Sequence, residues 1–376
     1  MPTRRFGETN NGEATENKPI SLCALVPYYP DTAPSQRYRL EQWKPYLENQ
    51  NIRTELVPFA DAELSKLLYQ PGRYAAKAQA MSAAFLRRIA AIATARRYDA
   101  VLIHRAACIM GPAVLERALA LLRCPVIFDF DDAIYLLNTS AANRHFGWLK
   151  FPGKTAAICR LSTHVVVGNS FLADYARRYN SQVTVIPSSV DTEQYRPAIR
   201  STPGKRVVLG WTGSSTSQTY LEMFAPVLRE ILAACDVELR VHSDREPELA
   251  GIPFVWRPWQ AETEVAEVAR FDIGIMPMPD DKWTRGKCAM KALLYMASGI
   301  PTVCSAVGAN CEVIQHGQNG LLATTPKEWI AHVKALAASP ELRLQLGMAG
   351  RQTIEEQYSM KSCATAFAHV VREVSK

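Results

Sequence analysis

Short apolar segments of strand length alternate with helix-length patterns along most of this chain of 376 residues. ISLCALVP at 20–27 and DAVLIH at 99–104 are two of twelve strand candidates, and most of these are followed by a helical pattern. This alternation predicts parallel sheets with helices on both faces, because each strand must return to the same sheet edge through a helix. It excludes all-helical and all-β folds and places the chain in the α/β class.

The alternation stops once and then starts again. The intervening stretch at 187–205 has three prolines, a glycine and no periodicity, which is typical of a domain linker. We therefore expect two Rossmann-like domains, at 19–190 and 206–358, joined by a linker at 191–205. Because ligands bind at the carboxyl ends of parallel strands, the two sheets should face a central cleft.

The composition indicates in which cellular compartment the protein is expected. The segment 1–18 is polar and has no apolar core, which indicates a disordered tail rather than a signal peptide. No run of about 18 apolar residues is present, so no membrane span is expected. None of the nine cysteines forms a C-x-x-C pair, which favours reduced thiols in a cytoplasmic protein.

Positive charge is concentrated in the first half. Residues 1–200 contain 25 Lys and Arg against 17 Asp and Glu, a net charge of +8, whereas the rest of the chain has a net charge of −1. This asymmetry predicts an anionic partner, a phospholipid surface or a phosphorylated acceptor, rather than nucleic acid, for which no motif is present. The helical pattern at 74–97 is either core-facing with a solvated basic side or rests on an anionic membrane through Arg87, Arg88, Arg96 and Arg97.

A glycine- and serine-rich turn in the second half is a candidate phosphate site. In GWTGSSTS at 210–217, Gly213, Ser214, Ser215 and Thr216 lie between a strand and a helix. Backbone N–H groups and hydroxyls at the positive end of a helix bind anions. An ordinary turn with a capping hydroxyl has the same pattern.

A basic segment further along is the second phosphate candidate. Arg285, Gly286 and Lys287 lie at an expected helix start, where cations are unfavourable unless an anion binds. Lys291 follows one turn later on the face of Lys287. A solvated basic turn is the alternative. Arg257 completes the candidates for donor binding.

The first half offers a cluster of carboxylates. Asp129, Asp131 and Asp132 end the expected strand PVIFDF, and neighbouring carboxylates raise one another's pKa and suit hydroxyl or proton contacts. Asp132 could equally cap a following helix.

Three arginines and one histidine flank the same sheet edge. Arg37 and Arg39 follow the first strand, and Arg105 comes directly after His104, the last residue of the strand DAVLIH. The arginines are candidates for acceptor or phosphate contact, with surface positions as the alternative for Arg37 and Arg39. A lone histidine is more often structural, so His104 is not counted among the candidates.

Two sets of strings carry a family resemblance. The second half has Lys287 through Gly299-Ile300-Pro301, AVGANCEVI at 306–314 and HGQNGLL at 316–322. The first half has APSQRYR at 33–39 and FDFDDAIY at 128–135. Together these strings resemble retaining family 4 glycosyltransferases of the GT-B fold, in a bacterial branch, over roughly residues 20–375.

The resemblance implies transfer of a hexose from a nucleotide diphosphate sugar to a glycan or lipid-linked acceptor, with retention, in cell-surface polysaccharide synthesis. The C-terminal domain would bind the donor and the N-terminal domain the acceptor, without a metal or other cofactor, in the cytoplasm or at the inner face of the cell membrane. A last helix at 359–376 would cross back to the N-terminal domain. Asp131, Lys287 and Arg285 are the expected catalytic residues; the expected donor-binding residues are Gly213, Ser214, Ser215, Thr216, Arg257, Gly286, Lys287 and Lys291, and the expected acceptor-binding residues are Arg37, Arg39, Arg105 and Asp129.

The sequence departs from the family pattern at two places. The family's Glu-x7-Glu pair falls on Gly286 and Leu294, neither of which can accept a hydrogen bond through its side chain. Asp131 stands where members of the family commonly have a histidine. Lys287 and Lys291 would compensate through the diphosphate. Two alternatives remain open: a non-catalytic GT-B binding or scaffold protein, and a nucleotide-sugar epimerase.

Overall fold

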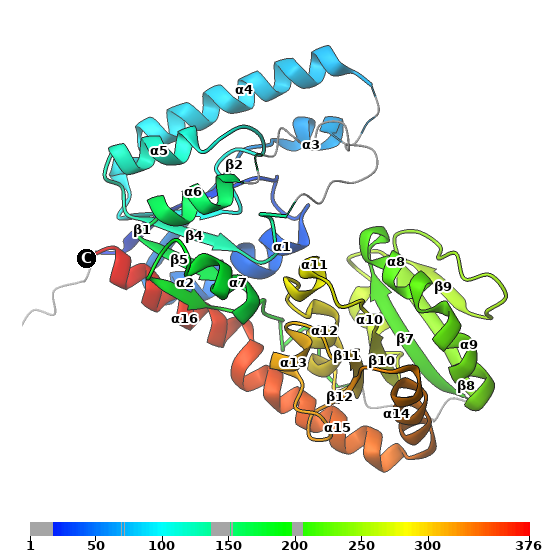
Figure 1. Ribbon diagram of the computed structural model, residues 1–376. Coiled ribbons are helices and arrows are strands. Elements are labelled where there is room, and N and C mark those ends of the chain that lie inside the picture. Colours follow the sequence, from blue (N-terminus) through cyan, green and yellow to red (C-terminus); the bar gives the residue numbers. More distant parts are fainter. Residues whose placement is uncertain (1–17, 69, 71, 137–150, 152, 198–205) are drawn as a thin grey trace, which may run out of the picture.

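The computed structural model describes residues 18–68, 70, 72–136, 151, 153–197 and 206–376, which form two α/β domains (Figure 1). The expected tail, except for Lys18, and residues 198–205 of the expected linker lie outside the described residues.

The N-terminal domain contains a parallel six-stranded sheet in the order β2-β1-β3-β4-β5-β6. Its strands are β1 (Ile20–Val26), β2 (Ile52–Pro58), β3 (Ala100–His104), β4 (Val126–Phe130), β5 (His164–Val167) and β6 (Val183–Val185). The two central strands β3 and β4 are buried along their whole length, which explains why they are almost entirely apolar.

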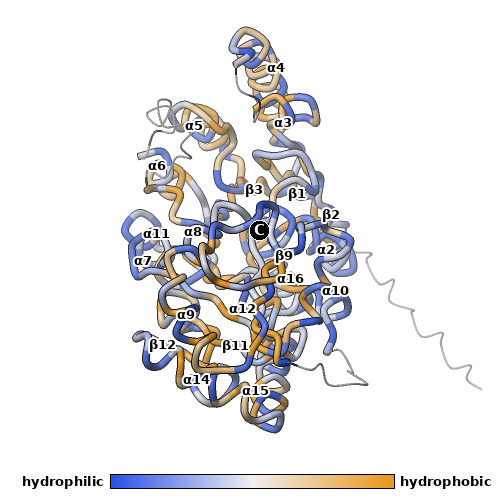
Figure 2. Tube along the Cα trace, turned by 90° about the vertical axis from the view of Figure 1, so that its right-hand side faces the viewer, coloured by the Kyte–Doolittle hydropathy of each residue, from blue (hydrophilic) through white to orange (hydrophobic). Residues whose placement is uncertain are grey.

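Helices cover both faces of this sheet. They are α1 (Pro34–Gln36), the π-helix η1 (Arg37–Glu41), α2 (Lys44–Glu48), α3 (Ala62–Leu68), α4 (Tyr74–Ala93), the 3-10 turn η2 (Ala95–Arg97), α5 (Val114–Leu121), α6 (Gly153–Leu161) and α7 (Ser170–Ala176). Residues of α4, α5, α6 and α7 pack on one face, and α2 packs on the other. α4 lies at the end of this domain that is farthest from the C-terminal domain (Figures 1 and 2).

The C-terminal domain repeats the plan with a sheet of order β12-β11-β10-β7-β8-β9, again parallel. Its strands are β7 (Val207–Gly213), β8 (Val237–Ser243), β9 (Val255–Pro258), β10 (Ile273–Met276), β11 (Thr302–Ser305) and β12 (Leu321–Ala323). All twelve expected strands are therefore confirmed.

The helices of the C-terminal half are α8 (Ser215–Met223), α9 (Ala225–Ala234), α10 (Glu264–Val268), α11 (Lys282–Arg285), α12 (Met290–Ala297), α13 (Asn310–Val313), α14 (Pro326–Ala338), α15 (Pro340–Thr353), the π-helix η4 (Ile354–Tyr358) and α16 (Met360–Val374). The helix-length pattern at 216–235 forms two helices, α8 and α9, which separate at Phe224 just before Pro226. In the described part of the chain, no helix combines the length and hydrophobicity needed to cross a membrane.

The last helix, α16, returns to the N-terminal domain and completes its core. Phe367 is fully buried and packs on Trp43, with ring centroids 5.5 Å apart. The chain thus crosses between the domains twice, and the crossings pair through backbone hydrogen bonds from Val190 to Tyr358 and from Met360 to Val190. Arg351 fixes this junction by donating to the carbonyls of Thr192, Tyr195 and Ala297.

Candidate functional site

A cleft of about 670 Å³ lies between the two domains, within the range of small-molecule sites. The segments after β1, β3 and β4 form one wall, and the segments after β7, β8 and β10 form the other. Of the expected site residues, those that line the cleft are Arg37, Arg105, Asp131, Gly213, Ser214, Thr216, Lys287 and Lys291.

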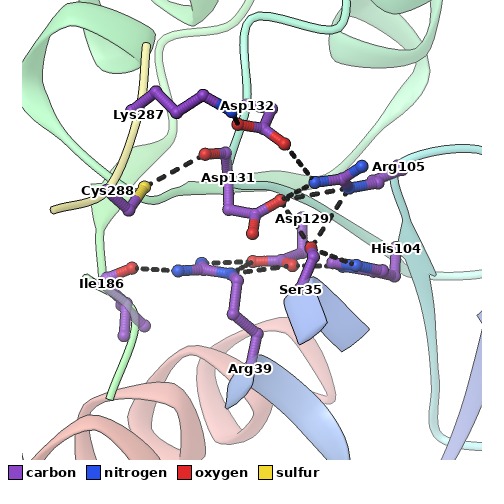
Figure 3. Close-up of polar contacts among 10 residues, drawn as sticks. All are labelled: Ser35, Arg39, His104, Arg105, Asp129, Asp131, Asp132, Ile186, Lys287 and Cys288. Carbon is purple, nitrogen blue, oxygen red and sulfur yellow. Dashed lines mark hydrogen bonds and ion pairs between the residues drawn. The ribbon is translucent and has the colours of Figure 1, made fainter. Parts of the chain in front are cut away.

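The N-terminal wall carries a network of charges (Figure 3). Asp131 Oδ1 accepts hydrogen bonds from Ser35 Oγ at 2.6 Å and from Arg105 Nη2 at 2.8 Å. Arg105 also donates to Asp132 Oδ2 at 2.5 Å. The other oxygen of Asp132 lies 3.5 Å from Lys287 Nζ of the C-terminal domain, so the network reaches across the cleft.

Two carboxylates of this cluster, Asp131 and Asp129, have pKa values shifted in the direction opposite to that expected. Burial would raise the pKa of Asp131, but Arg105, His104 and Arg39 outweigh it and hold that pKa well below its usual range. The pKa of Asp129 is likewise lowered: burial raises it, and Arg39 and His104 more than compensate. The sequence suggested mutual repulsion of three carboxylates, whereas in the structure cations lie between them.

Arg39 and Asp129 lie beneath the cleft instead of lining it. Both are fully buried. Arg39 Nη2 donates to Asp129 Oδ1 at 2.5 Å, and Arg39 Nη1 donates to the carbonyl of Ile186 at 2.7 Å. Their expected contact with an acceptor therefore does not agree with their position, and they support the floor of the site.

Lys287 and Lys291 form the basic part of the C-terminal wall. Lys287 was expected at a helix start, but it lies in the loop between α11 and α12. Its Nζ lies 4.9 Å from the ring centroid of Trp283. Lys291 Nζ donates to Ser217 Oγ at 3.0 Å and lies 5.1 Å from the ring centroid of Trp211.

Lys291 has a strongly shifted titration. Burial, and then the neighbouring Lys287, lowers the pKa of Lys291 to about 7. Among the described residues, no carboxylate forms an ion pair with this lysine. An anion bound beside the two lysines would offset both effects.

The glycine- and serine-rich turn is placed at the cleft, but one of its donors is already used. A Cβ on Gly213 would lie 2.6 Å from Lys291 Cε, so a larger residue here would displace the lysine side chain. Ser215, by contrast, does not line the cleft: its N–H donates to Asp244 Oδ1 at 2.5 Å and its hydroxyl donates to Oδ2 of the same carboxylate. Gly213, Ser214 and Thr216 remain facing the cleft.

Three further expected residues lie outside the cleft lining. Arg285 is half exposed and pairs with Asp280 at 2.5 Å. Arg257 is exposed near the end of β9. Gly286 packs against the N-terminal domain, where a Cβ would lie 2.8 Å from that of Ala133, so a glutamate does not fit at this position. Leu294, at the other motif position, does line the cleft and makes it apolar there.

Arg37 connects the two walls. Its Nη2 lies 3.7 Å from Glu264 of α10 and donates to the Tyr38 hydroxyl at 3.0 Å. Glu264 also lines the cleft.

Sequence reasoning missed several residues that the structure brings to the site. Ser35 and His104 belong to the charge network, and Trp211 and Glu264 line the C-terminal wall. The string APSQRYR at 33–39 drew attention to the arginines alone, although Ser35 lies in the same string. Trp211 lies in the string GWTGSSTS but was not singled out, and His104 was set aside as structural. No local pattern marks Glu264.

Comparison with protein families identifies the C-terminal domain. Residues 206–339 match the family model described as Glycosyl transferases group 1, from the start of β7 to the end of α14. No curated protein matches the chain in sequence.

Solved structures share the whole architecture. Sucrose-phosphate synthase from Thermosynechococcus elongatus is similar over 95% of this chain and 99% of its own, with a TM-score of 0.69 and 14% identity. HepE from Anabaena in complex with UDP-glucose gives a TM-score of 0.64 and 14% identity over 94% of this chain and all of its own. The lipopolysaccharide outer core galactosyltransferase WaaB gives 0.59 and 14%, with the same coverage. At these identities the likeness confirms the GT-B fold.

Proposed function

We propose that this chain, whose C-terminal domain matches the Glycosyl transferases group 1 model, transfers a hexose from a nucleotide diphosphate sugar to a glycan or lipid-linked acceptor. The observation that carries the proposal is the pairing of the two cleft walls. Lys287 and Lys291 on the C-terminal side face Asp131 and Asp132 on the N-terminal side. The first pair suits a diphosphate, and the second suits sugar hydroxyls.

The chemistry follows from this arrangement. The bond between the anomeric carbon and the diphosphate oxygen breaks, and its electron pair leaves on the diphosphate. Lys287 and Lys291 stabilise the negative charge that develops there. The acceptor hydroxyl attacks the anomeric carbon and transfers its proton to the departing diphosphate. Attack on the same face, with retention, is our inference from the family resemblance, and no protein nucleophile is invoked.

The proposed donor class draws support from HepE, which was solved with UDP-glucose. The proposed acceptor class draws support from WaaB, which is a lipopolysaccharide galactosyltransferase by name. Transfer onto a lipid-linked acceptor, in cell-surface polysaccharide synthesis at the cytoplasmic face of the membrane, is the setting that we propose.

The proposed membrane contact is α4. Tyr74, Leu86 and Ile89 are 70%, 67% and 43% exposed on this helix, an apolar surface on the basic half of the chain. Arg88 was expected to contribute to this surface, but it is buried and donates to the carbonyl of Val26. Arg87, on the same helix, pairs with Asp61.

The test is incubation of the protein with a panel of nucleotide diphosphate sugars, with and without lipid-linked and glycan acceptors, followed by mass spectrometry. Glycosylated product or slow donor hydrolysis supports the transferase. A changed sugar from the donor alone supports the epimerase. Binding of a nucleotide diphosphate without turnover of any donor supports the non-catalytic scaffold.

A further inference from the structure

Ser35, His104 and Asp129 form a continuous hydrogen-bonded chain at the floor of the cleft (Figure 3). Ser35 Oγ lies 3.0 Å from His104 Nε2, and His104 Nδ1 lies 2.7 Å from Asp129 Oδ2. His104 and Asp129 are fully buried, and Ser35 lines the cleft. The order of groups is that of a serine nucleophile with its base and orienting carboxylate.

Counting protons shows that Ser35 is not a nucleophile. Asp129 is ionised and only accepts, so Nδ1 of His104 carries a proton. The single hydroxyl proton of Ser35 is taken by Asp131 Oδ1 at 2.6 Å, so Nε2 of His104 must also carry a proton and donate to Ser35 Oγ. Arg105 Nε donates to the same oxygen at 3.1 Å. Both lone pairs of the hydroxyl are therefore occupied.

The series of hydrogen bonds through Ser35 instead ends on the carboxylate of Asp131. Its Oδ1 accepts from Ser35 and from two nitrogens of Arg105, whereas no described residue donates to its Oδ2 (Figure 3). The carboxylate is thus held by one oxygen, and the other is left for a ligand in the cleft.

We propose that Ser35 and His104 are positioning residues that hold the Asp131 carboxylate with Oδ2 as the open hydrogen-bond acceptor for a sugar hydroxyl. Asp129 and Arg39 fix His104 from behind, since Asp129 accepts from both. This role rests on the proposed glycosyl transfer and deepens it, because it assigns the N-terminal wall to the recognition of sugar hydroxyls.

The same contacts set the protonation of Asp131. The charged and titratable groups around Asp131 come from both domains. They are His104 at the end of β3, Arg105 directly after it, Arg39 of η1, the flanking Asp129 and Asp132, and Lys287 and Cys288 from the C-terminal domain. His104 and the Ser35 hydroxyl are among the groups that lower its pKa. Removing either raises the pKa of Asp131, so the ionised acceptor is lost at a higher pH than in the wild type.

Three variants and one matched control test the proposal. Ser35→Ala removes the hydroxyl. His104→Asn keeps an amide donor near the Nδ1 position but removes the donor at the Nε2 position, so that only Arg105 donates to Ser35 Oγ. His104→Gln can reach the Nε2 position. His164→Asn is the control, because His164 is also a buried histidine with a hydroxyl partner, Thr184 Oγ1 at 2.9 Å. His164 lies at the start of β5, whereas the cleft is at the carboxyl ends of the strands.

Ser35→Ala and His104→Asn should lower kcat by about 10- to 100-fold, with the donor KM changed much less, because the lysine wall is intact. The acid limb of the pH–kcat profile should move to higher pH in both variants. His104→Gln should retain more activity than His104→Asn, and His164→Asn should match the wild type.

The titration of the Asp131 carboxylate, followed by ¹³C NMR and assigned with Asp131→Asn, provides a readout that does not depend on transfer. It should move to higher pH in Ser35→Ala and His104→Asn. An unchanged titration together with an unchanged acid limb overturns the proposal, as does an equal loss of activity in His164→Asn. A wild type that transfers no sugar refutes the proposed function, while the titration still decides the positioning role.

Discussion

Lys287 is the residue that most directly tests donor binding. Its Nζ lies at the cleft, 3.5 Å from Asp132, and it remains partly accessible to a ligand. A charge-assisted contact with a diphosphate contributes about 1.5–3 kcal/mol, so Lys287→Ala should weaken nucleotide diphosphate binding by roughly 10- to 100-fold. Lys287→Arg should be intermediate, because guanidinium geometry differs from that of an ammonium group.

Calorimetry with nucleoside and with nucleotide diphosphate distinguishes a phosphate contact of Lys287 from a role in folding. Nucleoside binding should barely change, since the nucleoside carries no phosphate. Lys282→Ala is the control, because Lys282 is exposed on the neighbouring α11 and does not line the cleft. Equal losses for nucleoside and diphosphate would make Lys287 a folding residue instead.

Lys291 predicts a pH dependence of donor binding. Its pKa of about 7 in the free protein should rise when a diphosphate binds, because the anion favours the protonated ammonium group. Affinity should therefore be level below about pH 7 and fall above it, by at most about tenfold per unit, since the complex must take up a proton. Calorimetry between pH 7.5 and 9.5 measures this slope.

Lys291→Arg is the matched variant for that measurement, because a guanidinium stays protonated throughout the range. Its binding should show little pH dependence. A wild-type affinity that is equally level across the range would show that Lys291 is not beside the diphosphate.

At this scale the sequence located the basic and acidic segments but not their partners. Lys287, Lys291 and Asp131 were found because they lie next to strand ends in recognisable strings. Arg39 was misjudged as a cleft or surface residue, since its buried partner Asp129 is 90 positions away along the chain. Local pattern does not show which charges meet when the sheet forms.

Among the elements, α16 is predicted to be essential to the N-terminal domain. Phe367 is fully buried against Trp43, and Phe→Ala changes in cores cost about 3–5 kcal/mol. Phe367→Ala should lower the stability of the N-terminal domain by that amount in urea unfolding. Phe85→Ala, at an exposed position of α4, should leave it nearly unchanged. Similar unfolding midpoints for the two variants would contradict the role of α16.

For α4, the prediction is binding to anionic lipid vesicles that weakens with salt. Leu86→Glu should reduce the binding. Leu344→Glu should not, because Leu344 has the same 67% exposure but lies on α15 of the C-terminal half. Sedimentation with vesicles of anionic and neutral composition checks this. Equal binding to neutral vesicles, or an equal effect of the two substitutions, would refute membrane docking through α4.

The elements themselves were the most predictable part of the molecule. Buried parallel strands such as β3 and β4 are almost continuous apolar runs, and such runs stand out in a sequence. All twelve strands were found, including the partly exposed β2 and β9. The first residues of the helices were predicted less accurately. Lys287 was placed at the start of a helix that begins at Met290, because the short α11, capped by Asp281, takes up the preceding residues.

For the molecule as a whole, we predict transfer without an added metal ion. Arg105, Lys287 and Lys291 bring positive charge to the cleft from both domains, and the diphosphate can be neutralised by these groups. Activity should persist in EDTA and should not depend on added Mg²⁺ in the donor assay. Loss of activity in EDTA, restored by Mg²⁺, would show that a cation completes the site.

The return of α16 has a consequence for how the protein is made. The strands of the N-terminal sheet are synthesised first, but the helix that covers the α2 side of that sheet leaves the ribosome only after the whole C-terminal domain. Until then, the apolar face that receives Phe367 stays open to water and to chaperones. The N-terminal domain can therefore finish folding only after the C-terminal domain has been synthesised. A chain that stops just before α16 contains both sheets but lacks the helix that completes the N-terminal domain.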